Sequence, residues 1–276
     1  MFDSHCHLTF PEFTTRVDDV MRLARAEGVF GAITIATSSA DAERSLEIAC
    51  RHPDVWCSAG IHPLHCDEPI DWETLRRCGA DPRCVAWGEL GLDNHYPKPP
   101  RALQHSVLNE QLARLERWAK EGLAKPIVIH CREAFDDLLP ILASSSLPRD
   151  RYVFHCFTGT ADEARRVLDF GAWISFTGVV TFRNAKEVAA AATLMPADRI
   201  MVETDAPFLT PDPIRTVRPN EPRYIPHIVR RIAELRGETF EACAERLDQN
   251  TERFFGISIR RGVASPPTRV GDPSHA

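Results

Sequence analysis

Two histidines near the start of the chain have the spacing of a metal-binding pair. His5 and His7 follow the apolar residue Phe2, with Cys6 between them. Side chains two residues apart on a β-strand project from the same face, so both imidazoles can bind one ion while Cys6 points away. Alone, this pair is a weak signal, because a histidine at a strand end is more often simply hydrogen-bonded.

Four further donors follow apolar segments elsewhere in the chain: Glu89, His130, His155 and Asp205. Each alone has an ordinary explanation, since a single carboxylate often caps a helix. Six such groups at one place would repel or desolvate one another unless a cation organised them. Four imidazoles and two carboxylates suit Zn²⁺, Mn²⁺, Fe²⁺ or Co²⁺ better than Ca²⁺, and are too many for one tetrahedral ion. We therefore expect one or two divalent ions, such as Zn or Mn, that activate water for hydrolysis.

Four residues at or near these donors are candidates for further roles in the reaction. Asp205 can orient the attacking water and take its proton. Arg132 follows His130 by two residues and can bind a phosphate oxygen, or it forms a salt bridge at the rim. His62 can contact the phosphate or assist the leaving oxygen, or it is a hydrogen-bonded rim histidine. Glu203 lies deeper on the side of Asp205, where a buried carboxylate would orient a ligand histidine.

Eight short apolar segments, each followed by a helical pattern, must position these groups. We expect strands near residues 2–6, 32–37, 55–61, 84–89, 126–130, 151–155, 172–176 and 199–204. Helices are expected between them because apolar residues recur at helical spacing, as in the run 17–27. This alternation indicates a parallel sheet, and eight units favour a (β/α)8 TIM barrel with its site at the C-terminal strand ends. An open doubly wound sheet is the alternative, although no GxGxxG motif follows the first strand.

The composition fits one soluble globular unit. Of the 276 residues, 43% are hydrophobic and 26% charged, and the net charge of −6 argues against a protein that coats nucleic acid through a broad basic face. Nine scattered cysteines without a CxxC pair fit free thiols in a reducing cytoplasm, and no stretch is apolar enough to span a membrane. We expect a barrel over residues 1–257 and a mobile tail over 258–276.

Seven motifs resemble the TatD family of metal-dependent deoxyribonucleases, over about residues 2–256. They are Asp3-Ser4-His5-Cys6-His7-Leu8, Gly60-Ile61-His62-Pro63, Gly88-Glu89-Leu90-Gly91-Leu92-Asp93, Ile129-His130-Cys131-Arg132, His155-Cys156-Phe157-Thr158-Gly159, Glu203-Thr204-Asp205-Ala206-Pro207 and Asn220-Glu221-Pro222. The resemblance implies the same six metal ligands, with Glu89 bridging two ions and acting with Asp205 as a catalytic carboxylate. It also implies phosphodiester cleavage, commonly as a 3′-to-5′ DNA exonuclease supported by a divalent metal such as Mg, with DNA ends or oligonucleotides as substrate. The sequence indicates no obligate protein partner.

The loops at the expected mouth leave the substrate open. Asn94 and His95 stand where the family often has aromatic residues, and Arg215 is followed by Thr216 rather than glycine. Basic residues in these loops are either a local positive rim or simply solvated, and aromatic residues either stack on bases or pack: Lys98, Arg101, Arg183, Arg215, Arg218, Arg223, Tyr96, Phe157, Phe182 and Phe208. The alternatives are a metallohydrolase of the same fold acting on a small ester, lactone, amide or phosphotriester, and a metal-binding scaffold without activity.

Overall fold

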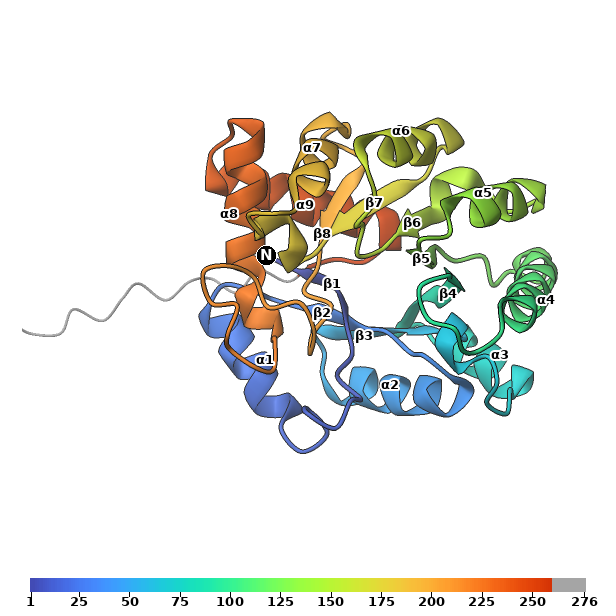
Figure 1. The fold of residues 1–276 in the computed structure, drawn as a ribbon. Coiled ribbons are helices and arrows are strands. Elements are labelled where there is room, and N and C mark those ends of the chain that lie inside the picture. The colour runs from blue at the N-terminus through green and yellow to red at the C-terminus, as the bar shows by residue number, and fades with distance from the viewer. Residues whose placement is uncertain (260–276) are drawn as a thin grey trace, which may run out of the picture.

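Eight parallel strands in chain order form the centre of the computed structural model, which describes residues 1–259 (Figure 1). The strands are β1 (Asp3–Cys6), β2 (Ala32–Thr34), β3 (Val55–Ala59), β4 (Cys84–Asp93), β5 (Ile127–Arg132), β6 (Tyr152–Phe154), β7 (Trp173–Phe176) and β8 (Ile200–Val202). Each strand pairs in parallel with the next one along the chain. The expected alternation of strands and helices is therefore confirmed.

The first and last strands meet and close the barrel. A parallel bridge joins Cys6 to Ala206, the His7 amide donates to the Ala206 carbonyl at 2.8 Å, and the Asp205 amide donates to the His5 carbonyl at 2.9 Å. Below them the buried Asp3 carboxylate accepts the Thr204 amide at 2.9 Å. The fold is thus the predicted (β/α)8 TIM barrel rather than an open sheet. Its closure brings His5 and His7 beside Asp205, the first and last of the predicted ligands in the sequence.

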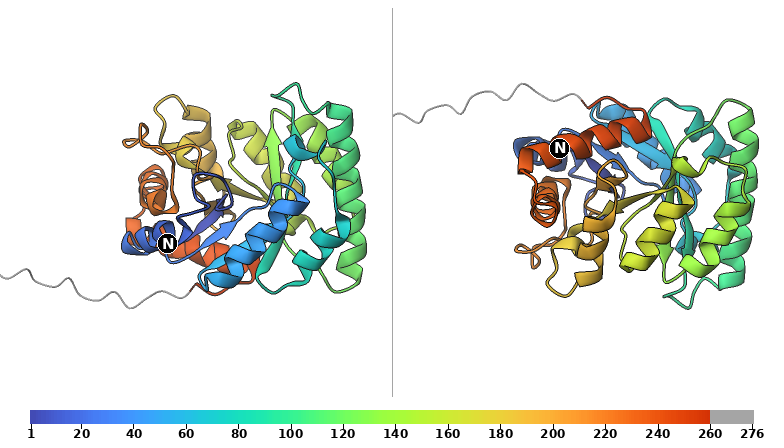
Figure 2. Two further views of the ribbon diagram at one scale, coloured as in Figure 1. Left: turned by 90° about the horizontal axis from the view of Figure 1, so that it is seen from below. Right: turned by 90° about the horizontal axis from the view of Figure 1, so that it is seen from above.

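Helices surround the barrel and run back from the C-terminal end of each strand (Figures 1 and 2). They are α1 (Val17–Ala26), α2 (Ser39–Arg51), α3 (Trp72–Ala80), α4 (Arg101–Lys120), α5 (Phe135–Ser144), α6 (Ala161–Phe170), α7 (Lys186–Leu194), α8 (Ile225–Arg236) and α9 (Phe240–Phe255). Local signals set several ends: Thr160 and Glu163 form a capping box before α6, and Gly171 ends that helix with φ +101°.

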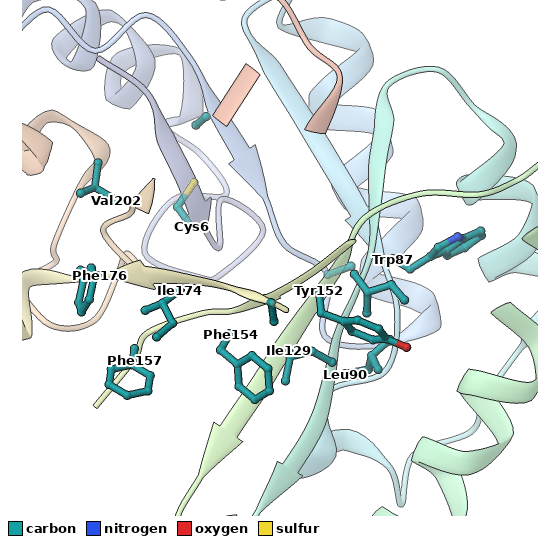
Figure 3. Close-up of a cluster of buried hydrophobic side chains, with 14 of the residues drawn as sticks. Cys6, Trp87, Leu90, Ile129, Tyr152, Phe154, Phe157, Ile174, Phe176 and Val202 are labelled. Atoms are coloured by element: carbon teal, nitrogen blue, oxygen red, sulfur yellow. The ribbon is translucent and has the colours of Figure 1, made fainter. Parts of the chain in front are cut away.

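Two apolar layers hold the elements together. Side chains on the outer faces of the strands, such as Ile129, Phe154 and Ile174, are buried in one cluster with the helices (Figure 3). A second cluster includes Phe2 and Met201 and is joined by Phe254 and Phe255 at the end of α9. Each fully buried aliphatic or phenyl side chain contributes about 1.5–3 kcal/mol to folding. The resulting scaffold is rigid enough to fix side chains at the mouth.

Strand β4 differs from the prediction and matters most for the site. It was expected to end at Glu89, but it continues to Asp93, with a register shift against β5 between Trp87 and Leu90. Gly88 has φ +111°, and a Cβ there would collide with the Val128 carbonyl oxygen of β5. Only glycine fits this close approach without strain. Glu89 consequently lies inside a long buried strand rather than at its end.

The other boundaries differ less. The predicted 32–37 and 199–204 segments are strands only over 32–34 and 200–202, because the chain leaves the sheet to form the mouth. From residue 260 onward, the predicted tail lies outside the described residues. Within residues 1–259, every helix is too short or too polar to cross a membrane.

Candidate metal centre

One half of the site is formed where β1 meets the end of β8. His5 Nε2 lies 3.3 Å from His7 Nε2, and Asp205 Oδ1 lies 3.6 Å and 3.4 Å from these two nitrogens. Glu89 Oε2 lies 3.4 Å from His5 Nε2. All four side chains are buried or nearly so. The spacing of two in the first motif thus directs both imidazoles to one point, as predicted.

The other half is formed by β5 and the end of β6, on the opposite oxygen of the same glutamate. Glu89 Oε1 lies 2.7 Å from His130 Nδ1 and 2.5 Å from His155 Nε2. The two imidazole nitrogens are 3.2 Å apart. Each carboxylate oxygen of Glu89 therefore faces a different group of donors. The six residues selected from the sequence come together in the barrel mouth.

The hydrogen bonds of two histidines direct lone pairs at the carboxylates. His7 Nδ1 lies 3.0 Å from the Ile35 carbonyl, which can only accept, so Nδ1 carries the proton and Nε2 is free to bind metal. Likewise His130 Nε2 lies 3.1 Å from Asp93 Oδ2, which leaves Nδ1 to face Glu89. A neutral nitrogen lone pair facing a carboxylate is unfavourable. The arrangement needs either a second proton on the ring or a cation between the groups.

The charges of the carboxylates also fit a cation. Burial alone would raise the pKa of Glu89, but the surrounding imidazoles, His155 first, hold it well below its ordinary value. Burial likewise opposes ionisation of Asp205, yet its contact with His7 lowers the pKa of that carboxyl. Two anionic groups thus lie in a buried, nitrogen-rich cluster. This donor set fits Zn²⁺ or another first-row transition metal.

His62 belongs to the cluster but is suited to another role. Its Nδ1 accepts the Leu64 amide at 3.0 Å, so the neutral ring carries its proton on Nε2, which lies 3.2 Å from Glu89 Oε1. Burial lowers the pKa of His62 to about 4, which keeps the ring neutral. The nitrogen turned toward the cluster is therefore a hydrogen-bond donor rather than a ligand. Such a donor suits contact with substrate, the role predicted from the sequence.

Glu203 lies beneath the cluster, as expected from its position two residues before Asp205. It is 1% exposed, and Oε1 lies 3.6 Å from His155 Nδ1 and accepts the Cys156 amide at 2.6 Å. The Ser175 hydroxyl donates to the other oxygen at 2.6 Å. These contacts fix the carboxylate against the inner edge of His155. Glu203 is placed to orient that ring.

Asp93, at the end of β4, contacts both a proposed ligand histidine and the loop that follows the strand. Oδ1 accepts the His95 and Tyr96 amides at 3.0 and 3.1 Å, while Oδ2 holds His130. The signal was present in the sequence, because residues 89, 91 and 93 share one face of a strand. It was hidden because β4 was expected to end at Glu89.

The cysteines beside the histidines lie in two environments. Cys6 is fully buried in the outer core, as strand alternation predicts. Cys131 packs partly against that core but also lines the cavity, as Cys156 does, and the Cys156 thiol lies 3.7 Å from the Thr177 hydroxyl. Within residues 1–259, the side-chain groups with metal-binding spacing contain His, Asp and Glu but no cysteine.

A cavity of about 700 Å³ opens above the donors. Arg132 lines it and stacks over Tyr96, with the guanidinium carbon 5.0 Å from the ring centre. On the side of His7, Phe208 is 49% exposed and packs edge-on against Phe10. Tyr96, 45% exposed, and Phe208 are two of the three large hydrophobic side chains exposed in the described chain. Phe157, in contrast, is buried in the core.

Comparison with known proteins agrees with this architecture. The family model described as "TatD related DNase" matches residues 2–256. The chain is 35% identical to the "Uncharacterized metal-dependent hydrolase YabD" of Bacillus subtilis, over 94% of this chain and 100% of the relative. It is 37% identical to the "3'-5' ssDNA/RNA exonuclease TatD" of Erwinia tasmaniensis, over 93% and 100%.

A solved structure extends the likeness to the fold. The TatD homologue YJJV from Escherichia coli superimposes with a TM-score of 0.86 at 28% identity, covering 94% of this chain and 98% of that one. The family model covers residues 2–256, the range that contains all seven motifs. With its sequence and its structure in agreement, the chain belongs to the TatD-related DNase family.

Proposed function

We propose that this protein is a metal-dependent phosphodiesterase that removes nucleotides from the ends of single-stranded nucleic acid, in the 3′-to-5′ direction. The observation that carries the proposal is the position of Glu89, whose two oxygens face two separate groups of donors. His5, His7 and Asp205 would hold one divalent ion, and His130 and His155 the other, with Glu89 shared. Such ions would lower the pKa of water and neutralise charge on the reacting phosphate.

The protein's own groups supply the proton transfers. Asp205 reaches the cavity at the edge of the cluster and is ionised, so its carboxylate can take the proton of the attacking water. The water oxygen forms a bond to phosphorus while the bond from phosphorus to the 3′ oxygen of the preceding nucleotide breaks. That oxygen leaves with the proton that Asp205 took from the water, and the products are a nucleoside 5′-monophosphate and a strand one nucleotide shorter.

Arg132 and His62 would hold the phosphate for this step. Arg132 ends β5 beside the donors, and its stacking on Tyr96 limits the positions open to the guanidinium. Its planar N–H groups can bind two phosphate oxygens at once. His62 follows β3, on the other side of β4 from Arg132, and its Nε2 lies 3.2 Å from Glu89 Oε1. Both side chains present N–H donors to the cavity, which suits binding of an anionic ester.

The aromatic rim favours nucleic acid over a small ester or lactone. Tyr96 and Phe208 lie on different sides of the cavity and remain half-exposed, although burial would stabilise both. Exposed rings beside a phosphate site are suited to stacking on bases, which contributes about 1–3 kcal/mol per base. A 700 Å³ cavity also has room for more than one nucleotide unit.

The deciding experiment is digestion of a 3′-tailed oligonucleotide with Mg²⁺, Mn²⁺ or Zn²⁺, beside a panel of small esters and lactones. We expect a ladder of shortened strands and free mononucleotides from the wild type, and none from Glu89→Ala or Asp205→Asn. Hydrolysis of an ester without release of nucleotides would show that the substrate is a small ester rather than nucleic acid. Binding of metal and DNA without any hydrolysis would show that the protein is a binding protein and not an enzyme.

The nine free cysteines fit the cytoplasm as the compartment in which the protein works.

A further inference from the structure

A second cavity of about 620 Å³ lies outside the metal centre, between α7 and α8. It is lined by the segment that follows the 3₁₀ helix Gly178–Thr181, by the start of α7, by α8 and by the loop after β8. These elements lie beside one another at the rim of the barrel (Figures 1 and 2). None of its lining residues belongs to the metal centre.

The charge of this groove is opposite to that of the protein. Four cationic side chains line it against two acidic ones: Arg183, Lys186, Arg230, Arg231, Asp212 and Glu234. The whole chain has the reverse balance, 33 basic against 39 acidic residues. The excess is therefore local.

Within residues 1–259, only one of these four cations has an acidic partner. Arg231 pairs with Glu234 at 3.3 Å, and Arg230 stacks over Phe240. Arg183 and Lys186 are exposed, and residues 1–259 offer neither of them an ion pair within 4 Å. At the first turn of α7 the N-cap Ala185 supplies no side-chain acceptor to the open amides, while Glu187 in the same turn accepts the Ala161 amide at 3.5 Å. Unpaired cations beside a helix N-terminus form an environment that favours phosphate groups.

One short segment separates this groove from the metal centre. Phe208 and Leu209 line the metal-site cavity, while Asp212 and Pro213 of the same loop line the groove. The loop is fixed to the 3₁₀ helix before α7, because the Asp212 amide donates to the Thr181 hydroxyl at 2.8 Å. Four residues of extended chain span at most about 14 Å. A nucleic-acid strand whose 3′ end lies at the metal centre can therefore reach the groove within a few nucleotides.

We propose that this groove binds the sugar-phosphate backbone of the substrate strand, upstream of the nucleotide being removed. The proposal rests on the proposed function for its substrate class, but it concerns binding rather than chemistry. Contacts to phosphates carry no sequence information. The groove thus raises affinity for long strands over dinucleotides without selecting a sequence, and it makes that affinity dependent on salt.

Fluorescence anisotropy with labelled oligothymidylates of two and twelve nucleotides tests this directly. Both are measured at several salt concentrations in the non-hydrolysing Asp205→Asn background. The groove variant combines Arg183→Gln with Lys186→Gln. The matched control combines Arg117→Gln with Lys120→Gln, an exposed pair with the same spacing at the far end of α4, away from the mouth.

We expect the groove variant to bind the 12-mer roughly five- to tenfold more weakly at low salt, with a salt slope less steep by about 1.4 for two lost contacts. The control should match its parent. A groove variant that keeps the parent's slope and its preference for the 12-mer would overturn the proposal. Release of mononucleotides by the otherwise unaltered chain reports the proposed function separately. If no mononucleotides are released but binding still depends on the groove, the proposed reaction is wrong and the groove proposal stands.

Discussion

Replacing Asp93 by asparagine should disable the metal centre through the proton on His130. The wild-type carboxylate accepts on both oxygens, from two backbone amides on one and from His130 Nε2 on the other. Asparagine has one accepting oxygen and one donating NH₂ group, so it can accept on one side only. If its oxygen stays with the two amides, its NH₂ group faces His130 Nε2. The ring must then move its proton to Nδ1, the nitrogen that faces Glu89.

The size of the effect follows from the two ways in which the side chain can respond. Turning the amide around would restore the bond to His130 but leave the His95 and Tyr96 amides facing a donor, at about 1–3 kcal/mol for each unsatisfied group. The ring should therefore change its tautomer instead. Loss of such a supporting partner typically lowers metal affinity 10- to 100-fold, or about 1.4–2.7 kcal/mol.

Competition with a chromophoric chelator measures this affinity without any assumption about substrate. Asp71→Asn is the matched control, because Asp71 also accepts two backbone amides, those of Glu73 and Thr74, but lies at the start of α3. We expect Asp93→Asn to lose zinc affinity in the stated range, and the control to retain that of the wild type. Equal affinities in all three proteins would refute the assigned tautomer of His130.

Three further outcomes follow from the geometry. Metal at 100 times its dissociation constant should stabilise the fold by about 2.7 kcal/mol, so chelation should lower the melting temperature by about 5–10 °C. Glu89→Gln should remove most of this difference. In calorimetry, a melting temperature unchanged by chelation would show that no ion binds. Phe208→Ala should weaken binding of a single-stranded oligonucleotide by about 1–3 kcal/mol in anisotropy titrations, and unchanged affinity would exclude base stacking there. Gly88→Ala should destabilise the protein by at least about 2 kcal/mol in denaturant titrations, because a Cβ meets the Val128 carbonyl, and a neutral effect would contradict the close approach of β4 and β5.

The sequence predicted the barrel, and the meeting of the six proposed ligands at its mouth, for a physical reason. Short strands that alternate with helices leave few other topologies, and donors that follow different strands must meet at one end of a parallel barrel. The pairing of His5 with His7 needed only the alternation of a strand. Comparison with relatives then confirmed the family.

Irregular backbone set the limit of sequence reasoning. The extension of β4 to Asp93 depends on a register shift, which alternation cannot reveal. The role of His62 depends on the Leu64 amide, a contact made only in the folded loop. The groove between α7 and α8 draws residues from segments more than 40 positions apart, such as Lys186 and Arg230, and only the packing of the helices brings them together.

Anomalous diffraction from crystals grown with Mn²⁺ or Zn²⁺ tests the shared role of Glu89 most directly. The proposed centre predicts two peaks about 3.5–4 Å apart, one on each side of the Glu89 carboxylate, and loss of both in crystals of Glu89→Ala. A single peak that is unchanged by this substitution, or density that remains empty between His5 and His155, would contradict it.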